Sequence, residues 1–155
     1  MSRAYIGIGS NLGDPRANVL AAIAALTAAG RVLAASSLYR TTPWGVANQP
    51  DYVNAAVLLE TDLAPRALLD ALKILEVRLG RVGAERWAAR VIDLDILTYD
   101  DRDVAEDGLT IPHRHLRERA FAVVPLAEID SSFEPLRAAL DARALAQVRR
   151  LDPAS

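Results

Sequence analysis

The feature that most constrains the fold is the order of strand-like and helix-like segments along the chain. Some segments are rich in β-branched residues or alternate in polarity, which is typical of strands, and two carry apolar residues at helical spacing. In chain order they are a strand at 3–10, a helix from Pro15, strands at 31–39 and 52–61, a helix from about Pro65, and a strand containing Asp93 and Asp95. This βαββαβ order predicts an α+β fold, a ferredoxin-like sandwich with two helices on one face of an antiparallel sheet. We expect the other face to be free for a site.

Both predicted helices have recognisable starts and apolar stripes. Asp14 is placed to cap the first helix, Pro15 suits its first position, and Gly30 ends the pattern. Its expected buried stripe is Val19, Leu20, Ile23 and Leu26. The second helix starts near Pro65, ends before Gly80 and carries Leu68, Leu69, Leu72, Leu75 and Leu79.

The rest of the chain is expected to form loops and short elements. Residues 41–50 contain too many prolines and turn-forming residues for regular structure, so they join two strands as a loop. Beyond the aspartate strand we predict a turn at 100–103, a short strand at 109–111, a basic helical segment at 113–120, and short helices at 126–129 and 136–145. With 155 residues, 52% of them hydrophobic, and no repeat or linker, residues 1–155 are expected to form a single catalytic domain.

Composition excludes several classes of function. The formal net charge of −2 provides no general basic field, so we expect neither nucleic acid nor an anionic membrane as a partner. There is no cysteine, which excludes disulfides, thiolate metal sites and cysteine nucleophiles. No apolar run has the length of a membrane span, and no signal-peptide pattern precedes the first strand. We expect a cytoplasmic protein that acts as a monomer.

Two aspartates interrupt a strongly apolar strand and are the clearest chemical signal. Residues alternate between the faces of a strand, so Asp93 and Asp95 project from one side while the apolar residues around them face a core. Their Cα atoms are about 6–7 Å apart in an extended strand, where like charges repel unless a cation lies between them. Mg²⁺ suits such a pair, because it takes one or two carboxylates and completes its coordination with water and phosphate. Arg86 and Arg90 lie just upstream and are suited to phosphate oxygens, so the segment predicts phosphoryl chemistry.

Other interpretations of the same residues are open. A bare Asp-x-Asp pair is more often the solvated face of an edge strand, although the neighbouring Arg86, Arg90 and Trp87 favour a site. A noncatalytic module that senses a small metabolite would need no magnesium. A nucleotide phosphatase would release its products without any acceptor molecule.

Five motifs extend over nearly the whole chain. They are Tyr-Ile-Gly-Ile-Gly-Ser-Asn-Leu-Gly at 5–13, Tyr-Arg-Thr at 39–41, Gln-Pro-Asp-Tyr-Val-Asn-Ala at 49–55, Arg-Val-Ile-Asp-Leu-Asp at 90–95 and Leu-Thr-Ile-Pro-His at 109–113. In this order they resemble the 6-hydroxymethyl-7,8-dihydropterin pyrophosphokinases of folate biosynthesis. The resemblance implies transfer of pyrophosphate from ATP to the hydroxymethyl group of the pterin, with release of AMP and with two Mg²⁺ ions as cofactors.

The same resemblance implies roles on the nucleotide side. Asp93 and Asp95 correspond to the residues that hold both Mg²⁺ ions, and Arg81 and Arg90 correspond to catalytic arginines of a mobile loop. The implied ATP-binding residues are Arg81, Arg90, Ile96, Thr110, His113 and Arg119.

On the pterin side, the resemblance implies that Asn54 reads the ring edge and that Tyr52 and Phe121 stack on the ring. These residue types suit a flat heterocycle, because aromatic faces stack on it and an amide offers both a donor and an acceptor. The full set of implied pterin-binding residues is Thr41, Trp44, Tyr52, Asn54, Trp87 and Phe121.

Several further residues have structural interpretations. Residues 9–13 lack the lysine of a phosphate-binding loop, so we interpret them as a strand-to-helix turn. Glu76 is expected to form an ion pair with a loop arginine, and His115 is expected on the surface. The chain departs from the usual family pattern at Gly83, Ala88, Ala89 and Gly108.

Overall fold

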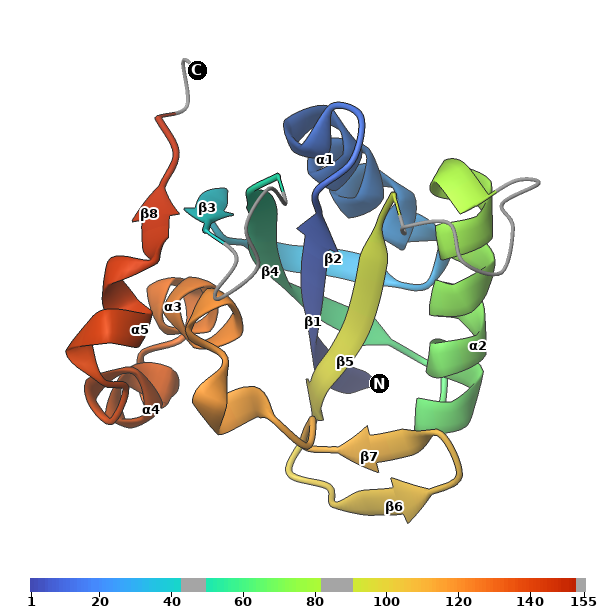
Figure 1. The fold of residues 1–155 in the computed structure, drawn as a ribbon. Helices are drawn as coiled ribbons and strands as arrows, with labels where there is room; N and C mark the ends of the chain where they lie inside the picture. Colours follow the sequence, from blue (N-terminus) through green and yellow to red (C-terminus); the bar gives the residue numbers. More distant parts are fainter. Residues whose placement is uncertain (43–49, 82–90, 153–155) are drawn as a thin grey trace.

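The computed structural model describes residues 1–42, 50–81 and 91–152, with the side chain of Arg81 also outside the description. Its main sheet has the strand order β5-β1-β4-β3-β8, with β2 also paired to β4, and β6 and β7 form a separate hairpin (Figure 1). All described pairings are antiparallel. The strands are β1 Ser2–Ser10, β2 Arg31–Ala35, β3 Tyr39–Thr41, β4 Tyr52–Thr61, β5 Asp93–Tyr99, β6 Val104–Glu106, β7 Leu109–Ile111 and β8 Val148–Arg150. The helices are α1 Pro15–Ala25, α2 Pro65–Glu76, α3 Ala120–Ile129, α4 Glu134–Ala138 and α5 Ala142–Ala146.

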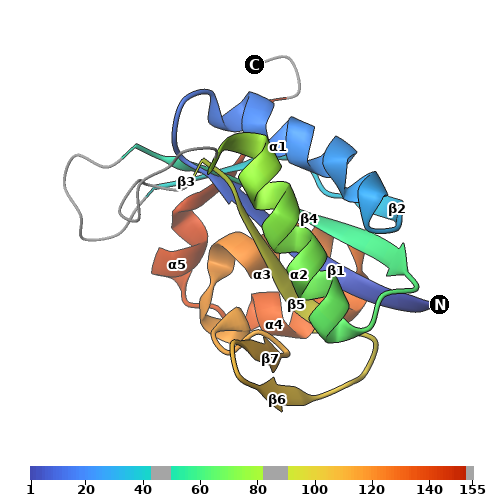
Figure 2. The ribbon, with the colours of Figure 1, turned by 90° about the vertical axis from the view of Figure 1, so that its right-hand side faces the viewer.

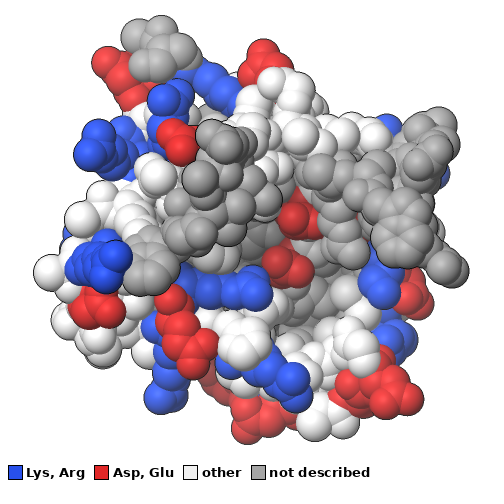
Figure 3. Space-filling model, viewed as in Figure 1, with Lys and Arg blue, Asp and Glu red and all other residues white. Residues whose placement is uncertain are grey.

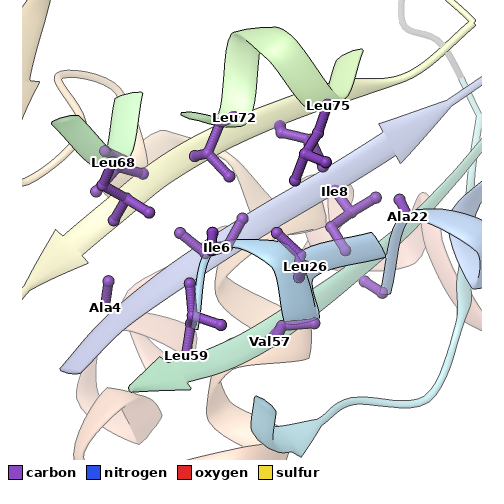
Figure 4. Close-up of a cluster of buried hydrophobic side chains, with 14 of the residues drawn as sticks. Ala4, Ile6, Ile8, Ala22, Leu26, Val57, Leu59, Leu68, Leu72 and Leu75 are labelled. Carbon is purple, nitrogen blue, oxygen red and sulfur yellow. The ribbon is translucent and has the colours of Figure 1, made fainter. Parts of the chain in front are cut away.

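The main hydrophobic core lies between one face of the sheet and helices α1 and α2. Alternate residues of β1 point into it, and leucines at helical spacing on α2 meet them from the other side (Figure 4). The labelled members of this cluster are Ala4, Ile6, Ile8, Ala22, Leu26, Val57, Leu59, Leu68, Leu72 and Leu75. This arrangement confirms the predicted ferredoxin-like α+β sandwich.

Helix α1 begins as predicted but buries a different stripe. The Asp14 side chain accepts a hydrogen bond from the backbone N–H of Ala17, and Pro15 is the first helical residue. Leu20, which we expected to be buried, is 49% exposed, whereas Ala22 is fully buried. The prediction for Leu20 was wrong because the close approach of α1 to the sheet is made by Val19 and Ala22, which turns Leu20 towards solvent.

The opposite face of the sheet is not wholly free, which corrects the expectation of two helices and one open face. Helix α3 packs on this face, as the two views of the ribbon show (Figures 1 and 2). Between α3 and the sheet lies the second hydrophobic cluster of the protein, which consists of Ala56, Leu97, Leu116, Ala122, Val123 and Leu126. A site on this face must therefore lie beside α3, where the sheet is left uncovered.

The predicted strand at 31–39 is divided into β2 and β3. Ala35 pairs with Val57 and Tyr39 pairs with Asn54, so four steps along this segment oppose three along β4. The Ser36 N–H still donates to the Ala56 carbonyl at 2.8 Å. The extra residue interrupts the pairing as a bulge does, and it redirects the chain before β3 begins.

The C-terminal part differs most from prediction. Residues 113–119 contain only a single 3₁₀ turn, Leu116–Glu118, where a helical segment was predicted. Helix α3 starts at Ala120, earlier than the predicted 126–129, and includes Pro125. Residues 136–145 are divided between α4 and α5. Strands β6 and β8 were not predicted, since Val-Ala-Glu and Val-Arg-Arg do not alternate between apolar and polar residues as Leu-Thr-Ile of β7 does. None of the described helices has the length and apolar character that a membrane crossing requires.

Candidate active site

A cavity of about 480 Å³ opens on the face of the sheet that α3 partly covers. Its floor comes from β1, β4 and β5, and its walls come from β3, α3 and the chain before β8. The lining residues are Gly7, Ile8, Gly9, Thr41, Thr42, Tyr52, Asn54, Ala55, Asp93, Asp95, Leu97, Arg119, Phe121, Ala122 and Gln147. Figure 3 shows acidic side chains inside a hollow on this face and basic side chains beside it.

Two glycines of β1 keep the floor of this cavity open. Gly7 lies opposite Asp95 and Gly9 opposite Asp93 in the pairing of β1 with β5. A Cβ atom on Gly9 would lie 2.9 Å from the Asn54 Nδ2 atom, and one on Gly7 would lie 3.2 Å from the Leu97 side chain. The role of these glycines in the cavity floor was not predicted from the sequence. The signal was present in the alternation of glycine with apolar residues, which places both glycines on one face of the strand.

Asp93 and Asp95 both line the cavity, while the intervening Leu94 is buried on the opposite face. Helix α2 holds the backbone between them, because the Leu94 N–H donates to the carboxylate of Glu76, the last residue of α2, at 2.8 Å. Glu76 is 5% exposed. We expected Glu76 to pair with a loop arginine, and residues 82–90 of that loop lie outside the described residues. Its bond to β5 was not foreseen, because it depends on how α2 lies along that strand.

A buried polar pair forms one side of the cavity. The Thr41 hydroxyl on β3 donates to the Asn54 Oδ1 atom on β4 at 2.8 Å, and both residues are buried. This bond fixes the amide plane and directs the Asn54 NH₂ group over Gly9. Tyr52 and Phe121 line the same cavity, with the Arg119 guanidinium 5.6 Å from the centre of the Phe121 ring. Thus the structure brings together four of the six residues expected to bind a pterin.

A second cavity of about 540 Å³ lies between β5, the β6–β7 hairpin and the segment before α3. Its lining residues are Leu69, Asp95, Ile96, Glu106, Asp107, Gly108, Leu109, Thr110, His113, Arg114, His115 and Arg119. Four of the six residues expected to bind ATP are among them. Asp95 and Arg119 line both cavities, so a carboxylate and a guanidinium stand where the two cavities meet.

His113 is held as a neutral donor in this second cavity. Its backbone N–H donates to the Leu97 carbonyl at 2.8 Å, and its Nδ1 atom accepts from the His115 N–H at 3.2 Å. Burial and the neighbouring Arg119 guanidinium lower the pKa of His113, while Asp95 acts in the opposite direction. A neutral imidazole that accepts at Nδ1 carries its proton on Nε2, so His113 can donate a hydrogen bond to a ligand. His115, which is exposed as expected, pairs with Glu118 at 3.1 Å.

The remaining expected residues cannot be placed in either cavity. Trp44, Trp87 and Arg90 lie outside the described residues, as does the side chain of Arg81. Within residues 1–42, 50–81 and 91–152, no three His, Cys, Asp or Glu side chains form a group that could hold a metal ion. Two carboxylates are nevertheless the donor set that Mg²⁺ uses when water and phosphate complete its coordination, so the residues present fit this ion.

Comparison with known proteins identifies the family of this chain. A family model described as 7,8-dihydro-6-hydroxymethylpterin-pyrophosphokinase (HPPK) matches residues 5–131. The chain is 49% identical over 131 residues to the 2-amino-4-hydroxy-6-hydroxymethyldihydropteridine pyrophosphokinase of Methylorubrum extorquens, covering 83% of each chain. It is 44% identical over 133 residues to the Haemophilus influenzae protein of the same name, covering 84% of this chain and 83% of that protein.

Solved structures share the fold. An HPPK-DHPS crystallised with substrates superposes on 88% of this chain with a TM-score of 0.72 at 14% identity. The chain spans 43% of the length of that protein. The family match and the high identities to the two bacterial enzymes show that the chain belongs to the 6-hydroxymethyl-7,8-dihydropterin pyrophosphokinase family, which transfers pyrophosphate from ATP to the hydroxymethyl pterin in folate biosynthesis.

Proposed function

We propose that the two cavities bind the two substrates of this reaction, the pterin between β3, β4 and α3, and ATP against β5 and the β6–β7 hairpin. The observation that carries the proposal is that the cavities adjoin at Asp95 and Arg119. The pyrophosphoryl group has to pass from one substrate to the other, so the reacting atoms belong at this junction. A positioned acceptor and donor supply much of the rate in such a transfer.

The pterin side is suited to reading a flat ring with a polar edge. The Asn54 Oδ1 atom already accepts a hydrogen bond from the Thr41 hydroxyl, so the Asn54 NH₂ group is the part of the amide left to face the ligand. We propose that this group bonds the ring edge and that Tyr52 and Phe121 stack on the ring. Trp44 and Trp87 are proposed to complete the pterin site, on the resemblance alone.

On the nucleotide side, His113 and Arg119 are proposed to donate to the triphosphate. The Nε2–H of a neutral His113 and the charge of Arg119 suit phosphate oxygens. Ile96 and Thr110 line the second cavity and not the first, and the adenine and ribose are proposed to lie against them. Arg81 and Arg90 are proposed as catalytic arginines that also bind ATP, a role that rests on the resemblance.

Asp93 and Asp95 are proposed to hold two Mg²⁺ ions. When bound, Mg²⁺ would neutralise phosphate charge and orient the β-phosphoryl group towards the acceptor hydroxyl. The contribution of the protein is the rigid placement of both carboxylates on one strand, with Glu76 holding the Leu94 N–H between them. Rigid placement matters because charge stabilisation in such a transfer depends on groups that are already in position.

We propose that residues 1–155 act as a single catalytic domain and as a monomer in the cytoplasm, without nucleic acid or a membrane. Both cavities lie on one sheet of one chain, and the net charge of −2 gives no general attraction to polyanions. Sedimentation equilibrium would report the mass of the particle in solution. A stable dimer would contradict the monomer.

Product analysis tests the reaction. The protein is incubated with ATP, Mg²⁺ and 6-hydroxymethyl-7,8-dihydropterin, and nucleotides and pterins are separated by chromatography. AMP and the pterin diphosphate are expected in equal amounts, and neither is expected when the pterin or Mg²⁺ is omitted. ADP and phosphate in the absence of pterin would indicate a nucleotide phosphatase, and binding without turnover would indicate a metabolite sensor.

A further inference from the structure

Strand β8 lies beyond the family match, which ends at residue 131, yet it borders the cavity proposed for the pterin. It pairs antiparallel with β3, with Thr41 opposite Val148, Arg40 opposite Arg149 and Tyr39 opposite Arg150. In Figure 1 it stands beside β3 at the end of the sheet. Strand β8 pairs with the outer side of β3, which has only three residues. Without β8, β3 would be the edge of the sheet.

Two hydrogen bonds define the ends of this pairing. The Thr42 N–H donates to the Gln147 carbonyl at 3.2 Å, and the Leu151 N–H donates to the Leu38 carbonyl at 2.8 Å. In an antiparallel ladder these two bonds enclose a pair that exchanges both of its own hydrogen bonds, here Arg40 and Arg149. The side chains of both arginines are exposed. Arg149 therefore contributes to the strand pairing through its backbone N–H and not through its side chain.

The two ends of β3 are held by different partners. At its start, the Tyr39 hydroxyl donates to Glu128 of α3, and the Ser37 N–H donates to the same carboxylate at 2.9 Å. At its end, Thr41 and Thr42 face β8. Thr41 is the residue whose hydroxyl orients Asn54, and Thr42 and Gln147 both line the cavity. Thr41 therefore lies between two strands, paired with Tyr52 of β4 on one side and with Val148 of β8 on the other.

The short segment before β8 is itself anchored. The Asp141 side chain accepts from the Ala144 N–H at 2.7 Å and caps α5, which ends one residue before Gln147. The C-terminal strand is thus presented to β3 from a capped helix rather than from an unanchored tail.

We propose that β8 is a positioning element for the pterin side of the site: it holds the end of β3 so that Thr41 orients Asn54, and Gln147 completes the cavity wall. The proposal rests on the proposed function for the identity of the ligand. It adds a specificity role for a part of the chain that lies outside the match to the family model.

Two variants at one exposed position separate the ladder from the side chain. Arg149→Pro removes the N–H that pairs with Arg40, and Arg149→Ala keeps it. Arg149→Pro is expected to weaken pterin binding about tenfold, the effect of misplacing one buried hydrogen-bonding group, while binding of a nonhydrolysable ATP analogue changes less than about twofold. Arg149→Ala is expected to bind both ligands normally. Equal losses for both ligands, or normal pterin binding in a folded Arg149→Pro protein, would overturn the proposal.

A double-mutant cycle tests whether β8 acts through Thr41. Thr41→Val removes the hydroxyl that orients Asn54. In a Thr41→Val background, Arg149→Pro is expected to cost little additional pterin affinity, and independent effects that add would refute the route through Thr41. Should Arg149→Pro fail to fold, Gln147→Ala, which leaves the backbone intact, is expected to lower pterin affinity about threefold with ATP binding unchanged. An unchanged pterin affinity in Gln147→Ala would then refute the role of the cavity wall.

One measurement does not depend on the ligand. The side-chain amide signals of Asn54 in the NMR spectrum of the ligand-free protein are expected to shift in Arg149→Pro but not in Arg149→Ala. If the unmodified protein did not bind the pterin, the proposed function would fail, and these signals would still decide whether β8 controls the orientation of Asn54. Unmoved signals in a folded Arg149→Pro protein would contradict the inference.

Discussion

The two faces of the central sheet are built from alternate residues of the same strands, but they are filled differently. On the face covered by α1 and α2, β1 contributes Ala4, Ile6 and Ile8, all fully or almost fully buried in one apolar cluster. On the other face, the same strand contributes Gly7 and Gly9 to the floor of a cavity. Strand β5 repeats the contrast, with apolar residues towards the helices and two aspartates towards the cavity.

The main hydrophobic core and the proposed site therefore lie on opposite sides of one sheet. Helices α1 and α2 close the first face, so its residues are constrained by volume and packing. The second face is covered only in part by α3, and missing side chains at Gly7 and Gly9 leave space for ligands. Glu76 links the two sides. It is the buried charged residue among those the structure describes, and it holds the backbone of the strand that carries the aspartates.

The largest expected effect is on the site face. Asp93→Asn and Asp95→Asn are each expected to lower turnover by orders of magnitude, because each removes a charged oxygen ligand from among phosphate groups. The thermal midpoint is expected to change little, since both side chains line a cavity. Steady-state kinetics and calorimetry give the two numbers. Asp103→Asn, at an exposed position, is the control. Near-normal turnover in either site variant would refute the metal assignment.

A truncation on the helix face is expected to do the opposite. Ile6 is completely buried between the sheet and the helices, so Ile6→Ala should lower the free energy of unfolding by about 2–5 kcal/mol. Ligand affinities of the folded fraction should stay close to normal. Denaturant unfolding with and without ligands measures both quantities. A selective loss of pterin binding in a stable Ile6→Ala protein would break the proposed division between the faces.

Adding a methyl group to the floor of the cavity should have a smaller, ligand-specific effect. The new Cβ of Gly9→Ala would press on the Asn54 amide, so pterin affinity is expected to fall by about 1–3 kcal/mol. Gly7→Ala is the graded comparison, because its Cβ meets the flexible end of Leu97, which can shift. Isothermal titration with pterin and with an ATP analogue ranks the two variants. If Gly7→Ala lost more pterin affinity than Gly9→Ala, the role given to Asn54 would be wrong.

The smallest effect concerns the contact that fixes α3 over the site face. The Tyr5 hydroxyl donates to Asp130 at 2.6 Å, and this bond is the main cause of the lowered pKa of Asp130. A carboxyl with a lowered pKa contributes stability above about pH 4, and that contribution is lost as the pH falls through its folded-state pKa. Tyr5→Phe should therefore cost about 1 kcal/mol or less near neutral pH, and the difference should shrink below about pH 4.

Chemical unfolding at a series of pH values measures this difference. The Tyr99 hydroxyl donates to the backbone carbonyl of Leu63 at 2.6 Å, an acceptor that does not titrate. Tyr99→Phe should accordingly show a cost that is independent of pH over the same range. A parallel pH dependence in both variants would indicate that Asp130 is not the responsible group.

Much of the fold followed from local pattern. The Asp14 cap, the prolines at 15 and 65 and the apolar stripes predicted the helices, and the alternation around Asp93 and Asp95 predicted their shared face. Other features had no local signal. The division between β2 and β3 arises from one extra residue opposite β4, and the position of α3 depends on packing against Ala56 and Leu97.

The candidate site divides in the same way. The site residues were proposed from the sequence, but nothing in it indicated that Asp95 and Arg119 line both cavities. That juxtaposition joins residues from β5 and the start of α3, and only the packing of those elements brings them together. The placement of Glu76 behind Leu94 has the same origin.

Local patterns were enough to predict the first two helices and the pair of acids on one strand, because periodicity and capping act over neighbouring residues. Only the packing of distant elements places α3 over part of the site face, Asp95 and Arg119 between the two cavities, and β8 beside β3. Val148–Arg150 shows no alternation of apolar and polar residues, and its pairing exists only when a partner supplies the opposite half of each hydrogen bond.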